Sequence, residues 1–189
     1  KLDFSSHAKA ITRQARSASN LIFRTFRSRN PATLTAAFCS YVRPILESAS
    51  PAWNSISLAT CDRIESVQRN FTKRVFLRCH FPVVSYSERL VKLSLEALRI
   101  RRAHLDVGFA YSVIRSSHFC PALKRAPHAR PHTTRDSYRL AFEIRPVKIR
   151  KRSAVNRVAK LWNAIPPKTR KLSRAAFNSR VAKLSFHRE

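Results

Sequence analysis

Residues 61–78 read CDRIESVQRNFTKRVFLR, and their order of apolar and charged side chains decides the fold class. The apolar positions recur at intervals of three and four residues: Cys61, Ile64, Val67, Phe71 and Val75. This interval is that of one α-helical face, so it predicts a helix from about Ser57 to Arg78. The cationic and amide side chains fall on its other faces: Arg63, Asn70, Lys73, Arg74 and Arg78.

The same periodicity continues on both sides and predicts a mainly α protein built as a helical bundle. The further helices are expected at about 5–28, 32–48, 85–92, 94–116, 153–163 and 173–185. Ser5 or Ser6 is expected to cap the first, and the Ser85 and Glu88 spacing is that of a capping box. Pro44 lacks an N–H group and crowds the carbonyl of Ser40, so we expect a kink there. The helix expected at 94–116 has Leu95, Leu98, Leu105, Phe109 and Val113 as its apolar face.

A change of composition after Ser117 predicts a division of the chain. Pro121, Pro127 and Pro131 lie among His and Arg residues, which is typical of a linker. We therefore expect a helical domain at 1–117 and a linker with a small basic subdomain at 118–189. Within the second part, partial alternation at 138–149 could supply a short β-hairpin, followed by a small helical pair around the sequence WNAIPP at 162–167.

The charge of the chain predicts a polyanionic partner. Lys and Arg number 38 against 10 acidic residues, a formal net charge of +28. Each neutralised phosphate releases counterions, so nucleic acid is the direct physical match for such a surface. The hydrophobic fraction is still 44%, which predicts a folded domain and not a disordered basic tail. A solvated basic surface with no specific ligand is the alternative.

What the sequence lacks excludes several classes of protein. Its one glycine, Gly108, excludes glycine-rich phosphate loops and dinucleotide-binding motifs, because both need close backbone approach. No apolar run is long enough to span a bilayer, and no secretion signal is recognisable at the start. Four scattered cysteines then fit free thiols in a reducing interior, so we expect a nuclear or cytoplasmic protein that is not secreted. The absence of Met suggests a fragment of a longer reading frame.

Candidate binding residues follow the helical period on faces away from the core. The first helix carries Arg13, Arg16, Arg24 and Arg27, the third carries Lys73, Arg74 and Arg78, and the fourth long segment carries Arg101 and Arg102. A row of cations with this spacing could follow a phosphate backbone. It could equally be an ordinary solvated helix face.

The order of motifs along the chain resembles a known family. The strings are YVRPILE and SPAW within 41–53, IESVQRNFTKR at 64–74, ERL at 88–90, LSLEALRIRR at 93–102 and LWNAIP at 161–166. This series resembles the thumb and post-thumb segment of reverse transcriptases from non-LTR retrotransposons of the LINE and jockey-like type. Ser48 departs from it, because such sequences more often carry an aromatic residue there. The resemblance implies a thumb-like domain that holds an RNA template and an RNA/DNA hybrid against the palm domain of the parent polymerase.

No catalytic residues and no metal site are predicted within the chain. Polymerases of the resembled class hold Mg²⁺ with palm carboxylates, whereas no two acids are adjacent here. Asp62 and Glu65 are one turn apart, but Glu65 also precedes Arg69 by four residues, the spacing of a structural ion pair. Cys79, His80, His118 and Cys120 could meet at a zinc ion, although no C-x-x-C pair is present. We therefore expect no cofactor in this chain, and inactivity as a polymerase alone.

Two other classes of protein remain as alternatives. The chain could be a self-standing, non-catalytic RNA- or DNA-binding protein, or a decayed retrotransposon remnant. It could also be a basic protein of the membrane surface, but the apolar stripe of the first helix is rich in alanine, which suits packing against another helix better than lipid. We therefore expect no membrane partner.

Overall fold

The computed structural model describes residues 4–54, 57–115, 138–140 and 154–184. These residues are mainly helical, as predicted. The chain divides into two compact units: unit 1 is Lys1–Ser50 with Ile56–Arg101, and unit 2 is Pro51–Ser55 with Arg102–Glu189. The composition placed the division after residue 117, whereas here it follows Arg101, within a continuous helix. No described helix is long and apolar enough to cross a membrane.

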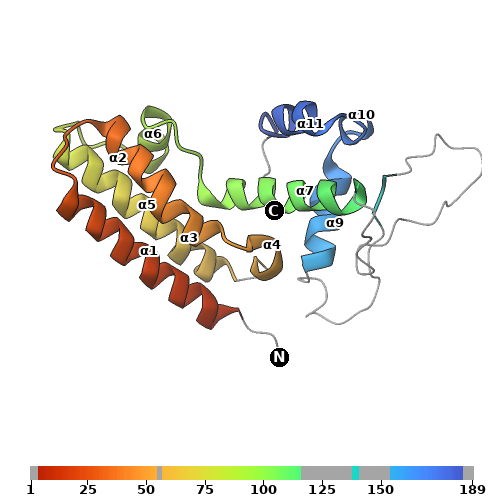
Figure 1. Ribbon diagram of the computed structural model, residues 1–189, viewed down its shortest axis with the longest axis horizontal. Coiled ribbons are helices and arrows are strands. Elements are labelled where there is room, and N and C mark those ends of the chain that lie inside the picture. Colours follow the sequence, from red (N-terminus) through yellow and green to blue (C-terminus); the bar gives the residue numbers. More distant parts are fainter. Residues whose placement is uncertain (1–3, 55–56, 116–137, 141–153, 185–189) are drawn as a thin grey trace, which may run out of the picture. The chain divides into compact units, whose positions relative to one another are not determined.

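Unit 1 is a bundle of helices built around two long parallel ones (Figure 1). Its elements are α1 (Ser5–Thr25), α2 (Pro31–Ala37), the π-helical turn η1 (Phe38–Val42), α3 (Arg43–Glu47), α5 (Leu58–Arg78), α6 (Tyr86–Lys92) and the first turn of α7 (Leu98–Arg115). Helix α1 packs against α5, η1 and α3, while α6 packs against α5. Figure 1 shows α1 and α5 running in the same direction.

The core of unit 1 forms where α1, η1 and α5 meet. Phe71 of α5 is fully buried, with its ring centroid 5.0 Å from that of Phe23 and 4.5 Å from that of Phe38. The predicted core face of α5, from Cys61 to Val75, is buried at all five positions. Aromatic contacts of this kind add to the burial of apolar area that stabilises the bundle.

Local sequence explains several helix boundaries. Asn30 accepts a hydrogen bond from the Ala32 N–H at 2.9 Å and caps α2, and Ser57 caps α5 in the same way. Ahead of Pro44 the helix widens into η1, where the Arg43 N–H bonds the Phe38 carbonyl, so the predicted disturbance occurs as a π-helical turn. The predicted Ser5 or Ser6 cap of α1 is wrong, because Phe4 is at the N-cap position and makes no side-chain cap.

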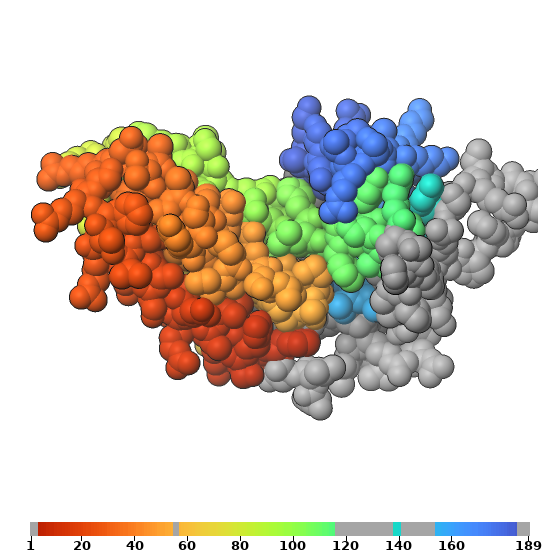
Figure 2. Space-filling model, in the orientation of Figure 1, coloured from red at the N-terminus to blue at the C-terminus, as the bar shows by residue number. Residues whose placement is uncertain are grey.

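Unit 2 consists of short helices around an aromatic cluster. Its described elements are α4 (Ser50–Trp53, of which Ser50 belongs to unit 1), the remainder of α7, α9 (Ala154–Ala164), α10 (Pro167–Arg170) and α11 (Arg174–Val181). Trp162 is buried with Tyr111 and Phe177, and the ring centroids of Tyr111 and Phe177 are 4.4 Å apart. Figure 2 shows α10 and α11 in blue at the surface of this unit.

The sequence Trp162–Asn163 ties α9 to the segment Tyr138–Leu140. The indole N–H of Trp162 donates to the Tyr138 carbonyl at 2.6 Å. The Asn163 amide pairs with both backbone groups of Leu140, at 3.0 and 2.9 Å, as a neighbouring strand would. Most of the hairpin predicted at 138–149 lies outside the described residues.

The apolar face predicted for α7 is confirmed at Leu98 and at Val113, which packs against the core of unit 2, and is wrong at Leu105 and Phe109. Leu98 is buried, but Leu105 and Phe109 are 36% and 43% exposed. The residues of α7 that enter the core of unit 2 are Val107, Ala110, Tyr111 and Ile114. Leu98 belongs to unit 1 and the later residues to unit 2, so no single apolar stripe describes the helix.

Candidate nucleic-acid interface

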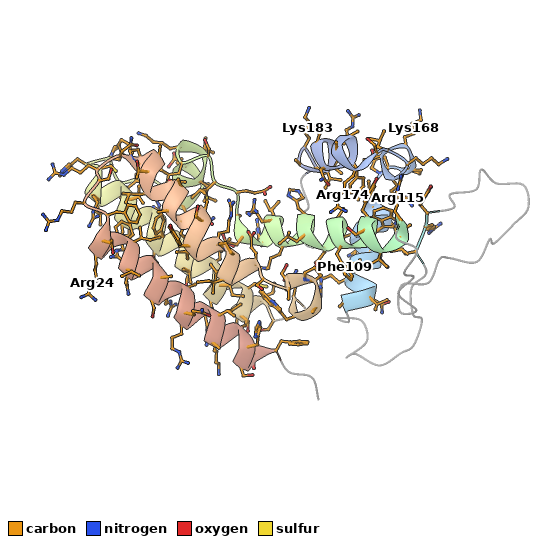
Figure 3. All side chains as sticks on the ribbon, viewed as in Figure 1. Arg24, Phe109, Arg115, Lys168, Arg174 and Lys183 are labelled. Atoms are coloured by element: carbon orange, nitrogen blue, oxygen red, sulfur yellow. The ribbon has the colours of Figure 1, made fainter. Side chains whose placement is uncertain are left out.

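Helix α1 presents a row of cations beside its buried face. Arg13, Arg16 and Arg24 are exposed, whereas Ala8, Ile11, Ala15 and Ile22 are buried. The helix contains no Asp or Glu, so nothing within it offsets their charge. Figure 3 shows the Arg24 side chain extending from α1 into solvent. A helical row of exposed guanidinium groups can contact successive phosphates.

The cationic edge of α5 lies against this row. Arg16 donates to the Ser66 hydroxyl at 3.0 Å, and Arg74 donates to the Asn20 carboxamide at 2.6 Å. Arg74 also stacks over the Phe23 ring, 4.0 Å from its centroid. We call this surface the α1–α5 seam and define it by Arg13, Arg16 and Arg24 of α1 with Lys73 and Arg74 of α5.

All the side chains that define the seam are cationic. Burial lowers the pKa of Arg74, and the positive charge of nearby Arg78 lowers it further. Among the described acids of unit 1, Glu47 is bonded to Arg101, Glu65 to backbone N–H groups and the exposed Glu88 to Ser85 in the capping box of α6, while Asp62 at the start of α5 is exposed. The seam therefore faces solvent as a cationic surface, which suits a polyanion.

The predicted binding residues divide into exposed and internally bonded side chains. Arg27 follows the end of α1 and is exposed, as is Lys73. Arg78 donates to the carbonyls of Phe23 and Phe26, and so caps the end of α1. These bonds assign Arg78 a structural role in unit 1.

Arg101 and Arg102 are also held by internal bonds. Arg101 forms a two-bond ion pair with Glu47, and this hydrogen bonding raises its pKa. Arg102 is 1% exposed and its Nε donates to Asn54 at 3.1 Å. Because Arg102 is buried, it does not present its guanidinium to a phosphate in this structure.

Glu65, which was predicted to form an ion pair with Arg69, is hydrogen-bonded to other groups. Glu65 is 7% exposed and accepts from the backbone N–H groups of Leu98 and Arg99, at 3.1 and 3.2 Å. It also accepts from the Tyr86 hydroxyl at 2.6 Å. Arg69 instead lies over the Tyr86 ring, 5.2 Å from its centroid. The predicted pairing of Glu65 with Arg69 is therefore wrong: Glu65 caps the start of α7, where the helix dipole favours an anion.

No metal centre is found within the described ranges, where no group of three or more His, Cys, Asp or Glu side chains could hold an ion. The Cys79 thiol donates to the Arg29 carbonyl at 2.9 Å, and burial raises its pKa. His118 and Cys120, the other two ligands considered for zinc, lie outside the described residues. Cys61 is buried and Cys39 partly buried, in keeping with the expected core positions.

Sequence reasoning overlooked a second group of cations, in unit 2. Lys168, Lys171, Arg174, Arg180 and Lys183 are exposed on or beside α10 and α11. The signal was present in the sequence, because residues 154–184 contain no Asp or Glu. We name these five residues the α10–α11 surface.

Comparison with known proteins gives one distant similarity. No protein-family profile matches the chain, and no solved structure matches it. The chain is 24% identical over 102 residues to an uncharacterized protein of Caenorhabditis elegans, B0403.1. The aligned stretch covers 54% of this chain and 52% of that protein, so the chain spans about half the length of this relative. Because that protein is described only as uncharacterized, the similarity supplies no activity to propose for this chain.

Proposed function

We propose that this chain is the thumb and post-thumb part of a non-LTR retrotransposon reverse transcriptase, and that it grips the primer–template duplex through backbone phosphates. The observation that carries the proposal is the α1–α5 seam, where exposed cations form a row with no acid on α1. In this reading the catalytic carboxylates and their Mg²⁺ belong to a palm domain outside this chain.

Contacts between the motif strings support the resemblance. Glu47 of YVRPILE binds Arg101 of LSLEALRIRR, which joins two strings that are 54 residues apart. Glu65 of IESVQRNFTKR caps the helix that begins within LSLEALRIRR. Strings that are bound to one another belong to one folded unit, so their order is better explained by a shared fold than by separate chance matches.

The mechanism is positioning by charge. Guanidinium and ammonium groups contact phosphate oxygens along the duplex, and these contacts fix its register without reading its sequence. The internal bonds of Arg78 and Arg101 keep the supporting helices in place. Binding should therefore be strongly salt-dependent and weakly sequence-dependent.

A binding titration with a matched control tests the seam. We compare the wild-type chain, Arg13→Gln with Arg24→Gln, and the control Lys92→Gln with Arg99→Gln, which removes two exposed cations from α6 and α7 in unit 1. The ligand is a labelled RNA/DNA hybrid, followed by fluorescence anisotropy over a range of KCl concentrations. The plot of log K against log salt has a negative slope. The seam variant should reduce its magnitude by about 0.9 per lost phosphate contact. The control should lower it less.

Two results would count against the proposal. Equal slopes for the seam variant and the control would remove the seam as the binding surface. Equal affinity for the hybrid, duplex DNA and single-stranded RNA would favour a self-standing, unselective nucleic-acid-binding protein over a polymerase thumb. Preference for the hybrid together with a seam-dependent slope is the expected outcome.

A further inference from the structure

Of the five cations of the α10–α11 surface, Arg174 is bonded to another helix of unit 2, and the other four have no such bond among the described residues. The cations that hold this unit together are others: Arg157 binds Asp106, and buried Arg170 donates to the Ile165 carbonyl. Arg115 donates to the carbonyls of Lys171 and Leu172 and lies over the Tyr111 ring. Lys168, Lys171, Arg180 and Lys183 form no such bond within the described part of the chain. Their conformational freedom and their charge are therefore available to a ligand.

The form of α11 leaves most of the helix open to a large partner. Only Phe177 and Val181 of its residues are buried. Of the four exposed positions between Arg174 and Arg180, three carry small side chains, Ala175, Ala176 and Ser179, and the fourth is Asn178. Figure 3 shows Lys168 and Lys183 extending outward from α10 and α11, on the side away from α7, whereas Arg174 lies on the side toward α7, near Arg115 of that helix. Arg174 donates there to the Ser112 hydroxyl at 2.9 Å. Small side chains between outward lysines let an extended phosphate backbone approach closely.

The chemistry of the surface favours a nucleic-acid backbone over other anions. With no acid in residues 154–184, the surface is cationic over its whole length, where a solvated surface usually mixes both signs. A lipid surface would require a broad exposed apolar face, but Leu172 is the large apolar side chain here and is only 36% exposed. No exposed aromatic ring lies in the described α10 and α11, so bases of a single strand would have nothing to stack on.

We propose that the α10–α11 surface is a second binding site for the phosphate backbone of a nucleic-acid duplex, separate in sequence and in folded unit from the α1–α5 seam. It rests on the proposed function in taking nucleic acid as the partner. The chain is then bivalent: once one surface has bound, the other binds at the effective concentration set by their connection. The loss of either surface should therefore weaken binding by more than its own contacts alone would suggest.

The test uses the full chain and a short labelled RNA/DNA hybrid over a series of KCl concentrations. We compare the wild type, Lys168→Gln with Lys183→Gln, and the control Arg139→Gln with Lys160→Gln, which removes two exposed cations from other segments of unit 2. The first variant should weaken binding about tenfold or more and lower the salt slope by about 1 to 2, against little change for the control. Combination with Arg13→Gln and Arg24→Gln should lower the slope further. Far-UV circular dichroism melts check that all variants fold alike.

Lysine acetylation read by mass spectrometry locates the contact directly. Bound hybrid should protect Lys168, Lys171 and Lys183 from acetylation but leave Lys160 reactive. Equal protection of all four lysines, or binding by the Lys168→Gln and Lys183→Gln variant that equals that of the control, would overturn the second site.

The outcomes separate this inference from the proposed function. If the α10–α11 variant lost binding and the seam variant did not, the second site would be supported and the proposal that the seam binds nucleic acid would be wrong. The reverse result would sustain the seam alone. Failure of the wild type to bind any nucleic acid would remove both. Tighter binding to phosphatidylserine vesicles than to the hybrid, lost in the same variant, would make the surface lipid-binding and overturn the inference.

Discussion

Each unit contains a buried carboxylate at helix α7: Glu65 bonds the first turn of α7, and Asp106 is a residue of α7. The two are satisfied in different ways. Glu65 of unit 1 accepts from neutral donors, the Leu98 and Arg99 N–H groups and the Tyr86 hydroxyl. Asp106 of unit 2 accepts from the Asn54 amide and from two nitrogens of the Arg157 guanidinium. The first carboxylate uses the partial charge of a helix terminus, and the second uses a full counter-charge.

The difference shows how an excess of positive charge is distributed in this fold. Unit 1 stabilises Glu65 without an arginine, while Arg13, Arg24 and Lys73 stay exposed. Unit 2 uses Arg157 internally, yet still leaves the lysines of the α10–α11 surface exposed. Among the described acids, Glu47, Glu65 and Asp106 are bonded within the fold, whereas many of the described cations face outward, so this distribution favours a polyanionic partner.

Asp106→Asn should have the largest effect, because it leaves the Arg157 guanidinium without its counter-charge. The side chain of Asp106 is fully buried and that of Arg157 is 10% exposed. Breaking such a pair from one side costs about 3–5 kcal/mol of unfolding free energy. Trp53 and Trp162 both belong to unit 2, so urea unfolding followed by tryptophan fluorescence reports on this unit.

The double variant Asp106→Leu with Arg157→Met is the control for that experiment. Replacing both charges with apolar side chains of similar volume is often close to neutral. The double variant should therefore be more stable than Asp106→Asn alone. If the two variants were equally destabilised, the loss would come from packing and the comparison with Glu65 would lose its electrostatic basis.

Glu65→Gln should have a smaller effect on the other side of the comparison. The amide keeps one acceptor oxygen but turns an N–H donor toward the donors that Glu65 now satisfies. Leaving a buried donor unsatisfied costs about 1–3 kcal/mol. The loss should appear in far-UV circular dichroism, while the tryptophan transition of unit 2 stays close to that of the wild type. A shift of the tryptophan transition as large as that of the circular dichroism would show that the two units unfold together.

The hydroxyl that donates to Glu65 adds a pH dependence to unit 1. Burial raises the pKa of Tyr86 above its ordinary value of 10.0, and the charge of Glu65 raises it further. A group with a raised folded-state pKa contributes its stability below the unfolded-state value and loses it as pH rises above that value. Wild-type stability, measured by urea unfolding, should therefore decline above about pH 10 more steeply than that of Tyr86→Phe. Parallel declines would show that Tyr86 does not carry the effect.

Local patterns predicted the elements that depend on local physics. The apolar period at Cys61 to Val75 and the capping box at Ser85 and Glu88 both occur as expected. The partner of Glu65 was missed, because it comes from residues more than 30 positions away and no local spacing records it. The apolar face of α7 was predicted only in part, because that helix contributes to two units in turn.

The candidate site was predictable only in part, for a related reason. The sequence gives the positions of Arg13 and Arg24 on the exposed side of α1, since the apolar stripe defines the opposite face. The sequence does not show that Arg78, Arg101 and Arg102 form hydrogen bonds within the fold, because their partners are carbonyls and side chains from distant segments. A cation on a polar helix face has the same pattern whether it binds a ligand or caps a neighbouring helix.

Gly108→Ala should produce the smallest effect, and it strengthens helix α7, which Glu65 caps and to which Asp106 belongs. Gly108 lies within α7, two residues after Asp106, and an added Cβ atom would meet nothing within 4 Å. Alanine removes the backbone freedom that glycine has in the unfolded chain, so it should stabilise α7 by about 0.5–1 kcal/mol. The tryptophan-monitored transition of unit 2 should move to higher urea with an unchanged slope. Because an added Cβ atom would touch no neighbour here, a destabilised Gly108→Ala would mean that another part of the molecule packs closely against α7 at this turn. If the variant folds normally but binds the RNA/DNA hybrid less well, the ligand itself makes that close approach.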